Sequence, residues 1–153
     1  MANTYTQIHI QVVFAVKNRA TLIRPEWKDD LFKYMTGIIQ KREHKLLAIN
    51  GVPDHVHILI GLRPYQSISD LMKETKIGSM NFINDSGLTK SKFSWQDGYG
   101  AFSYSRSHIS RVIKYIQLQE EHHKKKTFLQ EYTEMLEKFQ VPFEERYLFK
   151  PVL

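Results

Sequence analysis

The sequence predicts an α+β fold: a ferredoxin-like split β-α-β arrangement, with an antiparallel sheet that has helices on one face and further helices at its C-terminal end. Short segments rich in β-branched and aromatic residues alternate with amphipathic segments at helical spacing. Their order is β-α-β-β-α-β, which is the order of the split β-α-β fold. Pro53 and Asp54 form a tight turn between the two middle strands. Residues 1–153 are expected to form a single domain.

The first strand, the first helix and the hairpin follow one another from the N-terminal end. Residues 8–16 concentrate β-branched and aromatic side chains, which predicts a strand. Pro25 suits the first position of a helix, and the apolar residues after it repeat at helical spacing through about Arg42. Residues 45–52 and 55–61 predict the two strands of the hairpin.

The second helix and the fourth strand come next. Ser67 or Ser69 is a suitable N-cap for a helix whose apolar positions run to Asp85. Residues 94–104 are rich in aromatic side chains and predict the fourth strand, near a break at Gly98 and Gly100.

Two more helices are expected after the fourth strand. Ser110 is a suitable N-cap, and residues 112–123 continue with apolar side chains at helical spacing. A last helix is expected over about residues 127–139. The periodicity alone does not say which face of the sheet these helices cover.

Composition limits the class of protein. The 22 Lys and Arg residues exceed the 16 Asp and Glu residues, and such a basic surface favours a polyanionic partner. The absence of cysteine excludes disulfides and thiolate metal sites. No apolar run approaches the roughly 18 residues of a membrane span, and the N-terminal residues lack a secretory pattern. A soluble cytoplasmic protein without a membrane partner is therefore expected.

The most informative pattern is the pair His55 and His57 on a predicted strand. Side chains two apart on a strand project from the same face, about 7 Å apart along it. Histidine is a common metal ligand, so the pair is half of a metal site. Taken alone, the same pattern also fits one buried and one exposed histidine, because two ligands do not define a site.

A second pattern lies on the helix predicted over residues 112–123. Tyr115 and Gln119 are four residues apart, so their side chains are neighbours on one helical face. A tyrosine hydroxyl and a neutral carbonyl ligand presented to a histidine pair are the parts needed for metal-assisted nucleophilic attack. Alone, Tyr115 also fits an amphipathic tyrosine of the core.

Together these residues resemble the single-tyrosine HUH transposases of single-strand insertion sequences, including the tyrosine transposases associated with repeated extragenic palindromes (REP). The residues that carry the resemblance are the His-hydrophobe-His strand and the later Tyr-x-x-x-Gln helix. Residues 5–14, 93–103 and 119–123 are also similar to segments of this family. The resemblance spans nearly the whole chain, in the expected order and spacing.

The resemblance implies a transposase that cleaves and rejoins single-stranded DNA, with hairpins at the ends of the element as the recognised structure. Tyr115 would be the nucleophile and would form a 5′-phosphotyrosine intermediate. His55, His57 and Gln119 would hold a divalent cation, Mg²⁺ or Mn²⁺. The resemblance also implies the split β-α-β fold and a homodimer in which one subunit can complete the site of the other.

Three points stay open at the level of the sequence. His122 and His123 follow Gln119 closely and offer either another third ligand or two exposed histidines at a helix end. No residue stands out as the general base. Five basic residues are candidates for DNA phosphate contacts, although each also fits a solvated surface position: Lys73, Lys76, Arg106, Arg111 and Lys114.

Two other functions compete with a transposase. The first is a non-catalytic or domesticated single-stranded nucleic-acid binding protein on the same fold. The second is a metal-dependent hydrolase that uses the His-x-His pair. The chain is shorter than the roughly 200 residues of a (β/α)₈ hydrolase barrel, and no Asp-His pair completes a dinuclear zinc site, so the sequence disfavours the hydrolase.

Overall fold

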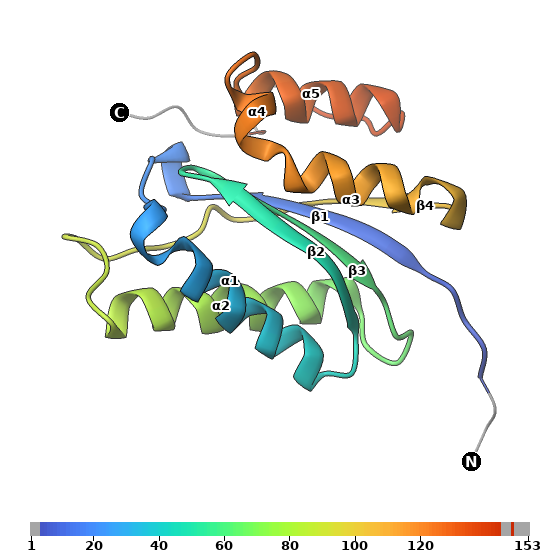
Figure 1. Cartoon of the computed structure of the whole chain (residues 1–153), viewed down its shortest axis with the longest axis horizontal. Helices are drawn as coiled ribbons and strands as arrows, with labels where there is room; N and C mark the ends of the chain where they lie inside the picture. The colour runs from blue at the N-terminus through green and yellow to red at the C-terminus, as the bar shows by residue number, and fades with distance from the viewer. Residues whose placement is uncertain (1–3, 145–147, 149–153) are drawn as a thin grey trace.

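Four antiparallel strands form one sheet in the order β2-β3-β1-β4 (Figure 1). The computed structural model describes residues 4–144 and residue 148. This strand order confirms the predicted α+β fold with an antiparallel sheet, and it places β1 and β3 at the centre. The strands are β1 (His9–Ala15), β2 (Lys45–Val52), β3 (His55–Gly61) and β4 (Gly100–Tyr104).

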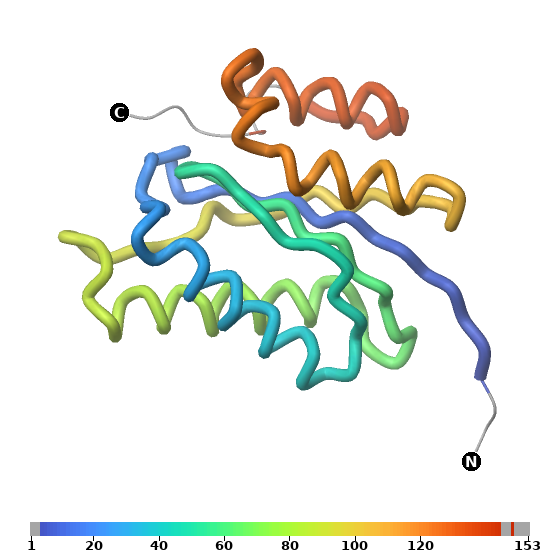
Figure 2. Tube along the Cα trace, in the orientation of Figure 1, coloured from blue at the N-terminus to red at the C-terminus, as the bar shows by residue number. Residues whose placement is uncertain are grey.

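Helices cover both faces of the sheet. Figures 1 and 2 show α1 and α2 side by side against one face, and the three later helices against the other. The first pair is α1 (Pro25–Lys41) and α2 (Ile68–Asp85). The later group is α3 (Ile109–Gln117), α4 (Gln119–His123) and α5 (Phe128–Lys138). Among the described residues, none of the helices combines the length and the apolar character that crossing a membrane requires.

Strand β3 divides its side chains between these two layers. Val56, Ile58 and Ile60 are buried in the core that the sheet forms with α1 and α2. Leu59 points the other way and packs with residues of α3. This alternation is the period of two that a strand imposes, and it sends the histidines of β3 toward the later helices.

Most predicted boundaries are confirmed. The fourth strand occupies only the part of residues 94–104 that follows the predicted break, because it begins at Gly100. Trp95 makes one isolated bridge with Val16 at the end of β1. The chain then turns at Gly98, whose φ of +85° lies in the left-handed region, and this turn separates the bridge from β4.

The expected cap at Ser110 is wrong. A short 3₁₀ turn, η2 (Arg106–His108), leads directly into α3, so the helix begins at Ile109 and Ser110 lies inside it. Because this turn already starts the helical path, no side-chain cap is formed at the N-terminus of α3. A second 3₁₀ turn, η1 (Lys17–Arg19), follows β1.

The helix predicted over residues 112–123 is interrupted at Leu118, which separates α3 from α4. Asn50 of β2 stabilises the end of α3. Its side-chain amide donates to the carbonyl oxygens of Ile116 and Gln117 at 3.0 and 3.1 Å. These are among the carbonyls that a helix end leaves without partners. The sheet therefore holds the end of the helix that carries Tyr115.

Candidate metal centre and nucleophile

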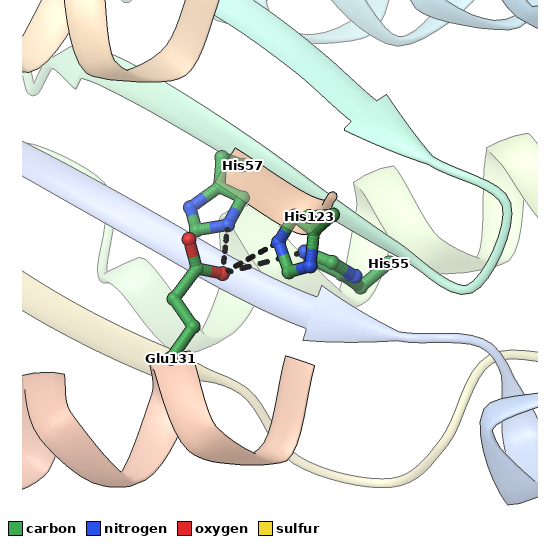
Figure 3. A group of neighbouring side chains, drawn as sticks. All are labelled: His55, His57, His123 and Glu131. Atoms are coloured by element: carbon green, nitrogen blue, oxygen red, sulfur yellow. Dashed lines mark hydrogen bonds and ion pairs between the residues drawn. The ribbon is translucent and has the colours of Figure 1, made fainter. Parts of the chain in front are cut away.

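Strand β3 places His55 and His57 on the same face, as the sequence predicted. Both side chains are fully buried, and their ring centroids are 5.2 Å apart. Figure 3 shows the two rings turned toward the same carboxylate. The sequence left open the alternative of one buried and one exposed histidine. The structure excludes it, because both side chains are buried.

Each of these rings has a polar partner at its Nδ1 atom. His55 Nδ1 donates to Asp54 Oδ1 at 2.7 Å, since a carboxylate can only accept. His57 Nδ1 lies 2.9 Å from Nε2 of Gln11, and Gln11 Oε1 accepts from the hydroxyl of Tyr104 at 2.9 Å. Such partners fix the orientation of a metal-binding imidazole and direct its Nε2 atom toward the ion.

Glu131 of α5 lies at the centre of the site (Figure 3). Its Oε1 atom is 3.0 Å from Nε2 of His57, 3.1 Å from Nε2 of His123 and 3.5 Å from Nε2 of His55. The four donor atoms lie within 4.8 Å of one another, close enough to hold one metal ion. Only 4% of Glu131 is exposed.

Glu131 is not among the site residues predicted from the sequence, although the sequence carries a signal for it. The buried face of α5 comprises Phe128, Tyr132, Met135 and Leu136, with Glu131 among them. A carboxylate on the apolar face of a helix is costly to bury unless it is paired. A capping box at Thr127 and Gln130 marks the start of α5 in the sequence. With that start fixed, helical spacing puts Glu131 on the apolar face.

The two histidines of α4 have different environments. His123 belongs to the cluster, so of the two alternatives left open by the sequence the exposed histidine does not apply to it. The ring of His122 instead packs against that of Tyr115, with centroids 4.5 Å apart.

Gln119, the predicted third ligand, is also fully buried beside this cluster. Its Nε2 atom lies 3.4 Å from Oε2 of Glu131 and 3.4 Å from the carbonyl oxygen of Tyr115. Among the described residues, Oε1 of Gln119 and Nε2 of His55 are buried without a hydrogen-bond partner. An unsatisfied buried polar atom costs about 1–3 kcal/mol. A cation would give both of these buried atoms a partner, so the residues present fit a cation.

Tyr115 reaches the same carboxylate from α3. Its hydroxyl donates to Oε2 of Glu131, and its ring centroid is 5.9 Å from that of His57. The tyrosine and the histidine pair therefore meet within one chain. Glu131 connects them, because one of its oxygens faces the imidazoles and the other holds the hydroxyl.

The charges in this cluster are set by burial and by the shared carboxylate. Burial raises the pKa of Tyr115, and the negative charge of Glu131 raises it further. Burial lowers the pKa of His57 and outweighs the opposite effect of Glu131. Burial alone would raise the pKa of Glu131, but the three histidines hold it well below its usual range. The arrangement therefore has an ionised carboxylate and a protonated tyrosine.

The pKa of His55 shifts in the opposite direction from that of His57. Burial would lower it, but the carboxylates of Asp54 and Glu131 outweigh burial and raise the pKa.

A pocket of about 520 Å³ opens beside Tyr115 and Glu131, between α3 and α5. Arg111, a predicted DNA contact, lines it. Other basic or imidazole side chains line it too, and the sequence analysis did not assign most of them to this site: His108, His122, Lys125, Lys126 and Lys138. Glu131 and Glu134 line it too, and Lys126 pairs with Glu134, but the basic side chains outnumber these carboxylates, so the pocket suits an anionic group.

The other predicted DNA contacts are spread over the molecule. Lys114 is exposed on α3, and Arg106 lines a second cavity near the N-terminal segment. Lys73 and Lys76 lie on α2, in the layer on the opposite face of the sheet. The ammonium of Lys76 donates to the carbonyl oxygens of Gln96 and Gly98, and burial lowers its pKa.

Comparison with solved structures shows the same fold in two proteins. A crystal structure of a transposase candidate from Deinococcus radiodurans R1 matches with a TM-score of 0.62 and 23% identity, over 78% of this chain and 96% of that chain. A structure described as a REP-associated tyrosine transposase bound to a REP hairpin matches with a TM-score of 0.55 and 17% identity, over 77% of this chain and 70% of that chain.

The sequence comparisons agree with the structural ones. The ISDra2 transposase TnpA of Deinococcus radiodurans is 25% identical over 118 residues, which cover 74% of this chain and 84% of that protein. The sequence profile of the family described as "Transposase IS200 like" matches residues 4–119, a segment that contains His55, His57, Tyr115 and Gln119. The chain therefore belongs to the IS200-like transposase family.

Proposed function

We propose that this transposase cleaves and rejoins single-stranded DNA through a covalent 5′-phosphotyrosine intermediate, with Tyr115 as the nucleophile. The observation that supports this most strongly is the meeting of the Tyr115 hydroxyl with the buried pair His55 and His57 around one carboxylate. A hydroxyl that is hydrogen-bonded to a carboxylate able to accept its proton, beside a group that would hold the scissile phosphate, is an arrangement suited to nucleophilic catalysis.

The first displacement forms a bond between the Tyr115 oxygen and the phosphorus, and it breaks the bond between the phosphorus and the 3′ oxygen of the preceding nucleotide. The hydroxyl proton leaves the tyrosine, and the departing 3′ oxygen gains a proton. In the second step a 3′-hydroxyl attacks the phosphotyrosine, reseals the strand and releases Tyr115. In the resting arrangement Oε2 of Glu131 holds the hydroxyl proton of Tyr115.

His55, His57 and Gln119 are proposed to hold a divalent cation, Mg²⁺ or Mn²⁺, as the family resemblance implies. Two buried atoms without a hydrogen-bond partner, Nε2 of His55 and Oε1 of Gln119, support this assignment. A cation bound there would polarise a phosphoryl oxygen and orient the phosphate for in-line attack. The residues around it contribute orientation, because Asp54 and Gln11 fix the two imidazole rings.

The proposed substrate is a DNA hairpin, since one protein of the same fold is described as bound to a REP hairpin. The basic pocket beside Tyr115 would receive the backbone near the cleaved bond. Phosphate contacts position nucleic acid without reading its sequence. Arg111 lines this pocket, and Lys114, Arg106, Lys73 and Lys76 are proposed contacts farther along the DNA. We also propose a homodimer acting in the cytoplasm.

The test is a covalent-adduct assay with Tyr115→Phe. Purified protein is incubated with Mn²⁺ or Mg²⁺ and a single-stranded hairpin labelled at its 3′ end, because the 5′-phosphotyrosine retains that side of the break. The wild type should give a labelled protein band, and Tyr115→Phe should give none while it still folds and binds the hairpin. Tyr34→Phe is the control, because Tyr34 stacks on Phe82 in the opposite layer.

Two results would contradict the proposal in different ways. An adduct formed by Tyr115→Phe would show that another tyrosine is the nucleophile. Hairpin binding by the wild type without any adduct, with either ion, would favour the alternative of a non-catalytic nucleic-acid binding protein.

A further inference from the structure

We propose that Glu131 and His123 are metal ligands together with His55 and His57, so that three imidazoles and one carboxylate hold the ion and Gln119 is not needed as a fourth ligand. This inference rests on the proposed function only in that the same site holds a cation. Neither His123 nor Glu131 lies in the segment that matches the family profile, which ends at Gln119. The two additional ligands come from α4 and α5.

The distances between the donor atoms fit one ion. Four ligands at about 2.0–2.1 Å from a tetrahedral ion lie roughly 3.3 Å from one another. Oε1 of Glu131 is 3.0, 3.1 and 3.5 Å from the Nε2 atoms of His57, His123 and His55. The full set lies within 4.8 Å, so small side-chain movements bring the four atoms to one coordination sphere.

The position of His55 points to the same conclusion. Its Nδ1 atom lies 2.7 Å from Oδ1 of Asp54, which holds the ring with Nε2 toward the cluster. Nε2 lies 3.5 Å from Oε1 of Glu131 and is buried without a hydrogen-bond partner. A cation in the cluster would give this buried nitrogen a partner.

Three imidazoles converge on one oxygen of Glu131. The Nε2 atoms of His57 and His123 lie within hydrogen-bond distance of Oε1 of Glu131, and that of His55 is close behind. A carboxylate oxygen offers two lone-pair directions, fewer than these three imidazoles would need as donors. A metal ion uses the same convergent geometry without any proton between the groups.

His57 is compatible with this assignment through Gln11. If the amide oxygen of Gln11 faces the imidazole, it accepts from Nδ1 of His57, and the amide nitrogen donates to the hydroxyl of Tyr104. Both partners stay at 2.9 Å, because an amide has a donor and an acceptor end of similar size. The Nε2 atom of His57 is then free to bind the ion.

The two additional ligands change what the centre can do. A carboxylate adds a negative charge that two imidazoles and a glutamine amide lack, so the ion is held more tightly. Three nitrogen ligands favour Mn²⁺, Co²⁺ or Zn²⁺ over Mg²⁺, which prefers oxygen. Glu131 also joins the ion to the nucleophile, because its second oxygen accepts from the hydroxyl of Tyr115.

The test measures metal binding without DNA and without catalysis. Full-length protein is freed of metal with a chelator and titrated with Co²⁺, whose visible absorption is strong when it has four ligands and weak when it has six. The wild type should develop the strong absorption. Glu131→Gln and His123→Gln should bind Co²⁺ about 100-fold more weakly or worse, since even supporting residues change affinity by about 10–100-fold. Glu137→Gln, an exposed carboxylate on the same helix, should bind like the wild type.

The alternative role of Glu131 predicts the opposite sign. If the carboxylate only pairs with the histidines when no metal is present, it competes with the ion, and Glu131→Gln should bind Co²⁺ as tightly as Glu137→Gln or more tightly. That result would overturn the proposal. Thermal unfolding of each metal-free variant shows whether it folds. If Glu131→Gln does not fold, Glu131→Asp keeps the charge but shortens the reach, and retained wild-type affinity in that variant would equally overturn the assignment.

Failure of this inference is separable from failure of the proposed function. If the wild type binds Co²⁺ through Glu131 but forms no phosphotyrosine, the proposed metal ligands are supported and the proposed catalytic function is contradicted. If the wild type forms the adduct and Glu131→Gln binds Co²⁺ normally, the catalytic function is supported and Glu131 is not a ligand. The ligands are then His55, His57 and Gln119.

Discussion

Asp54 lies in the turn before β3 and contacts His55, the first residue of that strand. Its carboxylate is the acceptor for Nδ1 of His55, while its backbone carbonyl accepts from the amide of Val16. A carboxylate behind a metal-binding imidazole fixes the ring and makes its other nitrogen a better ligand. The turn therefore connects β2 to β3 and also orients the imidazole of His55.

Asp54→Asn should weaken metal binding by about tenfold, since the amide keeps the turn and an acceptor oxygen but removes the charge. Calorimetric titration of the metal-free protein with Mn²⁺ measures the change. Asp30→Asn, exposed on α1 in the opposite layer, should leave the affinity unchanged. An unaltered affinity in Asp54→Asn would mean that Asp54 does not set the basicity of His55.

The site residues differ in how far the sequence could predict them. His55 and His57 follow from the period of two along a strand, which is a local rule, and Tyr115 and Gln119 follow from helical spacing. Glu131 required knowledge of which helix face turns toward the histidines. Its isolated charge on an apolar face was the only local signal.

At the scale of elements, the ends of the helices determine where the site residues lie. The break at Leu118 puts Tyr115 on α3 and Gln119 at the start of α4. Continuous helical spacing predicted the pair but not the break, because the break is supported from outside the segment. Asn50 on β2 satisfies the last carbonyls of α3, and no local pattern reveals such a contact.

The capping box of α5 gives a prediction at this scale. Thr127 accepts from the amide of Gln130, and Glu131 follows within the first turns of the helix. Thr127→Ala should destabilise the protein by about 1 kcal/mol and weaken Co²⁺ binding, because the turn that carries Glu131 becomes less ordered. Amide hydrogen exchange over α5 and Co²⁺ titration measure the two effects.

The matched control for this prediction is Ser67→Ala. Ser67 caps α2 in the same way, through the amide of Asp70, but α2 lies in the opposite layer. It should cost a similar free energy of unfolding and leave Co²⁺ affinity unchanged. Equal loss of Co²⁺ affinity in both variants would attribute the effect to general stability rather than to Glu131.

At the scale of the whole molecule, the sequence predicted the sheet better than the packing of the later helices. The strand order follows from the β-α-β-β-α-β plan, which leaves few arrangements for a compact sheet. The placement of α3, α4 and α5 over the face of the histidines depends on long-range packing of residues such as Leu59 and Val112. Periodicity states that a helix has an apolar face, but it does not state what covers that face.

The proposed homodimer is tested by the mass of the protein in solution. Sedimentation equilibrium should give about twice the chain mass of 18.1 kDa at micromolar concentration. The physical reason is that a small domain gains grip on an extended strand by pairing two sites. A mass of one chain, both with and without hairpin DNA, would count against two paired sites.

The distribution of charge gives the last prediction, on DNA affinity. The net charge of +6 and the basic pocket beside Tyr115 imply that binding releases counterions, so affinity for a hairpin should fall steeply with salt. Arg111→Gln should weaken binding and reduce the slope of log K against log salt by about 0.7–0.9, the value for one phosphate contact. Fluorescence anisotropy at several salt concentrations measures both quantities. Lys33→Gln removes the same charge from an exposed position on α1, in the layer away from the pocket, and should leave the slope unchanged. A similar loss of slope in both variants would show that the DNA responds to overall charge, and Arg111 would then have no specific place at the cleaved phosphate.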